Sequence, residues 1–89
     1  MTLCKHAYYS GRVQGVGFRF TALEVARSFV VGGTVRNCPD GSVELFVQAE
    51  APVVDAFLSA LSRRMEGYIE EQTACDAPPT DVVGFHIVR

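Results

Sequence analysis

The chain has 89 residues, of which 48% are apolar and 20% charged, and its formal net charge is −2. This length suits one small domain over residues 1–89, and the apolar content excludes a disordered chain. The net negative charge argues against nucleic acid and anionic membranes as partners. No apolar run is long enough to span a bilayer, and Met1–Lys5 lacks the apolar stretch of a signal peptide.

The N-terminal part of the chain predicts a strand followed by a helix. Residues 4–12 are rich in aromatic and apolar types, which favours a strand. Residues 20–30 indicate a helix that ends at Gly32 and Gly33. Its expected apolar face recurs at helical spacing and consists of Phe18, Ala22, Val25, Ala26, Phe29 and Val30.

A hairpin is predicted next. Residues 34–38 and 42–49 are strand-like, and Val43, Leu45 and Val47 alternate with more polar positions. The segment Pro39–Ser42 between them is a strong turn signal, because proline presets one turn position and Gly41 tolerates positive φ. The two strands are therefore expected to pair with each other.

The C-terminal part predicts a second helix and further extended segments. Pro52 suits the first turn of a helix, and Gly67 suits its end. Residues 68–76 and 82–88 are predicted as strands, with a proline-containing loop at 76–80. The expected apolar stripe of the helix is Val54, Phe57, Leu58, Leu61 and Met65.

The order strand, helix, strand, strand, helix, strand predicts an α+β fold, a ferredoxin-like split βαβ sandwich (βαββαβ). In that fold two helices pack on one face of a four-stranded antiparallel sheet. Because it hosts many unrelated functions, the function must come from particular residues.

The segment Gly11–Arg19 is the most informative of the chain. Three glycines in seven positions precede a helix, so backbone N–H groups can line an anion-binding nest. The positive end of the helix adds to this site, and Arg19 adds a charged fork suited to phosphate. The Walker and dinucleotide-binding patterns are both absent. A simple turn at the glycines is the alternative reading.

The other polar residues are less specific. Arg12 is expected at the surface or a strand edge, and His6 and His86 are expected to be structural or surface residues. Asn37 ends a predicted strand, where asparagine commonly bonds local backbone, although its amide is also able to hold a water.

The three cysteines, Cys4, Cys38 and Cys75, lack the paired spacing of zinc or redox motifs. We expect free thiols in a reducing cytoplasm. A Cys38–Cys75 or Cys4–Cys75 disulfide stays open, because spatial neighbours do not follow from sequence alone.

The segment Gly11–Arg19 resembles the first signature of the acylphosphatase family. Gly33–Asn37 together with Gly41–Val43 resembles the second, at the family's usual separation. The resemblance implies hydrolysis of acyl phosphates to a carboxylate and inorganic phosphate, without a metal, a cofactor or a phosphoenzyme. It also implies that Asn37 orients the attacking water. Phosphate would be held by Arg19 and the backbone N–H groups of Gln14, Gly15, Val16, Gly17 and Phe18.

Three positions depart from the family pattern, namely Val30, Thr34 and Ala49. They replace a frequent helix-ending glycine, a large aromatic residue and a frequent glycine, respectively. We expect effects on packing, efficiency or substrate preference rather than on the type of reaction.

Other functions remain open at this point. One is a non-catalytic anion-binding or regulatory module. A second is the corresponding domain of a larger maturation protein that handles carbamoyl phosphate, although the chain suggests a free-standing monomer. A third is an RNA binder, which the charge and the lack of a suitable aromatic motif disfavour.

Overall fold

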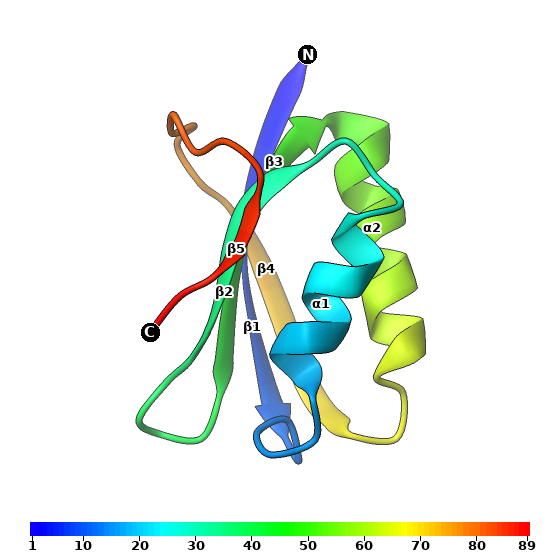
Figure 1. Ribbon diagram of the computed structural model, residues 1–89, viewed down its shortest axis with the longest axis vertical. Helices are drawn as coiled ribbons and strands as arrows, with labels where there is room; N and C mark the ends of the chain where they lie inside the picture. Colours follow the sequence, from blue (N-terminus) through cyan, green and yellow to red (C-terminus); the bar gives the residue numbers. More distant parts are fainter.

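The computed structural model describes all 89 residues. The chain forms five strands and two helices, whose arrangement is drawn in Figure 1. Their bounds, in chain order, are β1 (Thr2–Gly11), α1 (Phe18–Ala26), β2 (Gly32–Asn37), β3 (Val43–Glu50), α2 (Ala51–Arg64), β4 (Ile69–Asp76) and β5 (Phe85–Ile87). Neither helix has the length and apolarity needed to cross a membrane.

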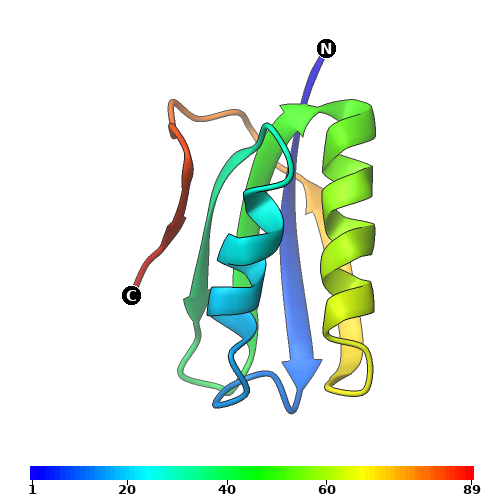
Figure 2. The same ribbon diagram turned by 45° about the vertical axis from the view of Figure 1, so that its right-hand side comes forward.

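The strands form one sheet in the order β4-β1-β3-β2-β5. β1 pairs antiparallel with both β3 and β4, and β2 pairs antiparallel with β3. Both helices cover the same face of this sheet (Figure 2). The predicted α+β, ferredoxin-like sandwich is therefore confirmed.

The sheet has one strand more than the predicted four, and this strand breaks the antiparallel pattern. β5 pairs parallel with β2, through Gly33–Val35. β4 and β5 lie at opposite edges, so residues 77–84 must cross the sheet. Gln48 holds this crossing segment by two 2.9 Å hydrogen bonds to the backbone of Thr80. Because the pairing with β2 covers only three residues, the regular strand is Phe85–Ile87 rather than the predicted 82–88.

The first helix also differs from its prediction of 20–30. It begins at Phe18 and ends at Ala26. Arg27, Ser28 and Phe29 then donate backbone hydrogen bonds three residues back, which tightens the chain out of the α-helix. Val30 is consequently 92% exposed, so its predicted place on the apolar face is wrong.

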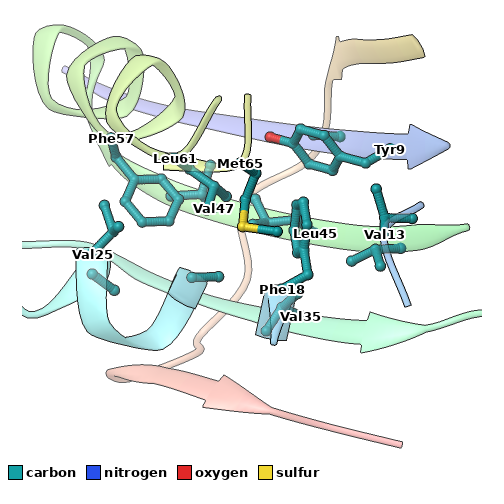
Figure 3. Close-up of a cluster of buried hydrophobic side chains, with 14 of the residues drawn as sticks. Tyr9, Val13, Phe18, Val25, Val35, Leu45, Val47, Phe57, Leu61 and Met65 are labelled. Atoms are coloured by element: carbon teal, nitrogen blue, oxygen red, sulfur yellow. The ribbon is translucent and has the colours of Figure 1, made fainter. Parts of the chain in front are cut away.

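The core lies between the helices and the sheet (Figure 3). Val43, Leu45 and Val47 of β3 are fully buried, as their alternation predicted. Phe57 and Leu61 of α2 meet the same cluster. Each such buried side chain stabilises the fold by about 1.5–3 kcal/mol relative to an exposed one. The same cluster includes Val13 and Phe18, so it holds both ends of the loop between β1 and α1.

Candidate active site

The loop between β1 and α1 has the backbone conformation that its glycines predicted. Gly15 and Gly17 have φ values of 77° and 81°, and no atom lies within 4 Å of a Cβ placed on either. Glycine is therefore favoured by conformation rather than by lack of space. Val13, which is only 1% exposed, anchors the loop in the core.

The backbone N–H groups of this loop are free. None of those from residues 13–17 donates a hydrogen bond within the chain. The first N–H groups of α1 lack intrahelical partners, as at every helix N-terminus. No side chain caps α1 and no acidic residue stands in its first turn. The positive end of the helix and the free donors are thus available to an anion.

The loop borders a cavity of about 210 Å³ that also contains the two predicted catalytic side chains. Arg19 enters it from the first turn of α1, and Asn37 enters it from the end of β2. The buried side chains of Val13 and Phe18 form its floor. The complete lining is Val13, Gly15, Gly17, Phe18, Arg19, Phe20 and Asn37.

Arg19 and Asn37 are both half-buried, and neither side chain is engaged elsewhere. Arg19 makes no ion pair and no hydrogen bond, and the Asn37 amide makes no hydrogen bond. A free guanidinium, a free amide and several free N–H donors therefore meet at one cavity. Two larger hollows, of about 390 and 410 Å³, lie along the helices, so donor chemistry rather than size distinguishes this one.

Two of the predicted phosphate-binding residues do not line the cavity. Gln14 and Val16 lie in the loop but contribute no lining surface. The side chain of Gln14 turns to the β2–β3 hairpin, where Nε2 donates to the carbonyl oxygens of Cys38 and Ser42, each at 2.8 Å. Any contribution of Gln14 and Val16 to anion binding would come from their backbone N–H groups.

Phe20 is a lining residue that sequence reasoning missed. Its side chain is 69% exposed, whereas the other two apolar side chains of the lining belong to the core. The available signal was its position, since Phe20 follows Arg19 directly and falls outside the apolar stripe of the helix.

The other candidate residues lie outside the cavity. The Arg12 guanidinium lies 5.6 Å from the ring centroid of Tyr68. His6 contacts Glu44, and His86 contacts the carbonyl of Val83. Thr34 is not part of the lining, so any effect of this departure on the site would be indirect. All three cysteines are free thiols.

The lining of the cavity contains no carboxylate, histidine, thiol or phenol. Arg19 is the single ionisable side chain in the lining, and its guanidinium has N–H donors but no acceptor. Tyr9 packs on Phe18, with ring centroids 4.9 Å apart. Burial raises the pKa of Tyr9 to about 12, so its hydroxyl stays protonated at neutral pH. The cavity thus offers donors and positive charge.

Comparisons with known proteins agree with this geometry. Residues 5–87 match the acylphosphatase family. An acylphosphatase of Methanospirillum hungatei is 39% identical over 88% of this chain and 85% of its own length. One from Legionella pneumophila is 32% identical over 97% of this chain and 96% of its own.

Solved structures show the same fold. The crystal structure of acylphosphatase from Bacillus subtilis has a TM-score of 0.89 at 26% identity, covering 98% of this chain and 99% of its own. Part of full-length HypF, 12% of that chain, has the same fold with a TM-score of 0.86 at 24% identity. With the family matched over nearly its whole length, the chain belongs to the acylphosphatase family.

Proposed function

We propose that this protein hydrolyses acyl phosphates to a carboxylate and inorganic phosphate, and that the cavity between the β1–α1 loop and Asn37 is where this happens. The observation that carries the proposal is the meeting of free loop N–H groups with the unpaired side chains of Arg19 and Asn37. Membership of the acylphosphatase family supports the same reaction.

The phosphoryl group would occupy the nest formed by the loop. Its oxygens would accept hydrogen bonds from the N–H groups of residues 14–18 and from the Arg19 guanidinium. Phosphoryl transfer depends mainly on positioning and on neutralising charge at the equatorial oxygens. Fixed donors provide both without rearranging during the reaction.

Asn37 would hold the attacking water through its amide. Water oxygen bonds to phosphorus as the bond from phosphorus to the acyl oxygen breaks, and the carboxylate leaves with that electron pair. The lining contains no carboxylate, histidine or thiol to take the water proton. We therefore infer that a phosphate oxygen of the substrate accepts the water proton. The departing carboxylate is a good leaving group and needs no acid.

The acyl half of the substrate would lie along Phe20. Once the phosphoryl group fills the nest, the remaining exposed apolar surface of the lining belongs to this one side chain. A pair of aromatic rings in contact contributes binding free energy beyond that of the buried area alone. We infer that acyl phosphates with aromatic or bulky apolar acyl groups bind better than acetyl phosphate.

The remaining assignments are coarser. We infer a monomer that acts on diffusible small molecules in the cytoplasm, and the three free thiols support a reducing compartment. No resident metal or cofactor enters the proposed reaction.

The direct test is turnover of benzoyl phosphate, followed by the release of benzoate and inorganic phosphate. The proposed function requires multiple turnovers, and inhibition by inorganic phosphate. Phosphate binding without any hydrolysis would overturn it in favour of a non-catalytic anion-binding module.

A further inference from the structure

The amide nitrogen of Gln14 is bound to the β2–β3 hairpin. Its Nε2 donates to the carbonyl oxygen of Cys38 and to that of Ser42, both at 2.8 Å. An amide nitrogen has two hydrogens to donate, and here both are used. These bonds join residues 24 and 28 positions apart in the chain, and they connect the loop to the β2–β3 hairpin, which follows the cavity residue Asn37.

The two acceptors lie on both sides of the hairpin tip. The Cys38 N–H donates to the Ser42 carbonyl at 2.8 Å, and the Gly41 N–H donates to the Cys38 carbonyl at 3.1 Å. Asp40 further accepts from the backbone N–H and the hydroxyl of Ser42. Gln14 therefore holds a turn that is already closed, so any movement of the loop relative to the turn would strain or break its bonds.

Asn37 precedes the residues that accept these two bonds from Gln14, which we call the Gln14 clamp. Asn37 is the last residue of β2 and pairs with Val43 of β3. The residue after it is Cys38, whose carbonyl oxygen accepts from Gln14. Because the Asn37 amide makes no hydrogen bond within the chain, its position over the loop depends on where the backbone is placed. No other hydrogen bond joins the loop at 12–17 to residues 37–42.

We propose that Gln14 is a positioning residue, which sets the distance between the phosphate nest and Asn37. The inference rests on the proposed function, since it assumes that phosphate lies in the nest and that water lies on Asn37. Loss of the clamp would leave each half of the site intact and would loosen their alignment. Misplacement of reacting groups by about 1 Å lowers a rate by up to about 100-fold.

The experiment compares Gln14→Met with Gln48→Met, using benzoyl phosphate and inorganic phosphate as probes. Gln48 makes the same kind of double amide-to-backbone contact, to Thr80, at the other end of β3. Both variants lose two hydrogen bonds to backbone and keep side-chain length, and Gln48→Met also loses the 3.4 Å contact that Cys4 Sγ makes with Oε1. We expect similar losses in melting temperature. Gln14→Met should lower kcat about 10- to 100-fold, with a smaller change in inhibition by phosphate, while Gln48→Met keeps kcat near that of the unaltered protein.

A double-mutant cycle with Asn37→Ala distinguishes positioning of Asn37 from a purely structural role of Gln14, because it measures whether the two effects on kcat depend on each other. If Gln14 acts through Asn37, Gln14→Met lowers kcat in the unaltered protein and has little further effect when Asn37 is already alanine. Additive losses in kcat would overturn the proposal, as would equal kcat values for Gln14→Met and the unaltered protein.

Two controls separate the possible failures. Circular dichroism confirms folding of each variant, and Gln14→Asn, whose amide reaches less far, replaces the methionine variant if that protein does not fold. The asparagine variant should show the same selective loss in kcat. Absence of turnover in the unaltered protein would count against the proposed function, whereas an active protein that is insensitive to Gln14 would count against the clamp alone.

Discussion

Arg36 and Glu44 lie directly opposite each other on β2 and β3, and Nε of Arg36 donates to Oε1 of Glu44 at 2.5 Å. The other carboxylate oxygen accepts from the Tyr8 hydroxyl at 2.9 Å and lies 3.1 Å from Nε2 of His6. One carboxylate therefore joins three neighbouring strands. The hydrogen bond from Arg36 is the main cause that lowers the pKa of Glu44 below its ordinary value of 4.5.

The first prediction concerns the pH dependence of stability. A lowered folded-state pKa contributes stability above the unfolded pKa of about 4.5 and loses it as pH falls through the folded value. Glu44→Gln should therefore destabilise the protein at pH 7 by about 1 kcal/mol, allowing for solvent screening, and the deficit should shrink below pH 4.5. Urea unfolding across pH measures it, with exposed Glu70→Gln as control. A deficit that stays constant with pH would contradict the linkage.

The second prediction concerns Arg19. Arg19→Ala removes the unpaired guanidinium from the cavity, and loss of one fixed donor to a phosphoryl group costs about 3 kcal/mol or more, or at least about 100-fold in kcat/KM. Inhibition by inorganic phosphate should weaken as well. Arg27→Ala, outside the cavity at the end of α1, is the control. Arg19→Lys should recover little, because lysine lacks the planar fork. Unaltered phosphate inhibition in Arg19→Ala would reject the contact.

The third prediction separates water positioning from phosphate binding. Asn37→Ala keeps Arg19 and the loop N–H groups, so inhibition by inorganic phosphate should stay close to that of the unaltered protein. Its kcat should fall by about 100-fold or more, because the attacking water is no longer held. Steady-state kinetics with benzoyl phosphate measure both effects. Near-normal kcat would show that Asn37 does not orient the water.

The fourth prediction concerns the acyl group. Phe20→Ser should reduce kcat/KM for benzoyl phosphate by about 2- to 10-fold, the range of a single aromatic contact. Activity on acetyl phosphate should change little, since its acyl group is too small to cover the ring. As a control, Val30→Ser alters an even more exposed apolar residue away from the cavity. If both substrates lost activity equally in Phe20→Ser, the ring would have no role in selectivity.

The fifth prediction concerns the proton acceptor. If a phosphate oxygen takes the proton of water, the pH profile of kcat/KM should follow the ionisation of the substrate. Substrates whose phosphate groups differ in acidity should then shift the profile. The variants His6→Gln and His86→Gln should leave it in place, because neither histidine lines the cavity. A profile independent of the substrate would point to a protein group instead.

Local sequence patterns predicted most of the fold. The alternation around Leu45 and the turn at Pro39–Ser42 depend on neighbours a few residues away, so the hairpin was predictable. The site followed from two motifs whose residues, Arg19 and Asn37, do meet at one cavity. The hairpin was thus predictable from patterns that repeat at short spacing, and the candidate site from two motifs that each lie within a short segment.

The features that escaped prediction depend on contacts between distant residues. The parallel pairing of β5 with β2 requires the segment at 77–84 to cross the sheet, and its anchor at Gln48 lies 32 residues from Thr80. The amide of Gln14 likewise finds its acceptors far along the chain. Neither composition nor periodicity carries such information. The prediction for Val30 was wrong for a different reason, since apolar character alone does not reveal where a helix stops.

The short strand β5 also has a consequence for how the chain assembles. β2 pairs with β3 on one side, and its other edge is covered by Phe85–Ile87 together with backbone hydrogen bonds to Gly84 and Val88. An open strand edge is a template for pairing with another chain. Because β5 follows β2, β3 and β4 in the chain, β2 stays uncovered until the segment with β5 has been synthesised. Docking of this C-terminal segment on β2 thus removes a site at which the sheet could extend into a neighbouring chain.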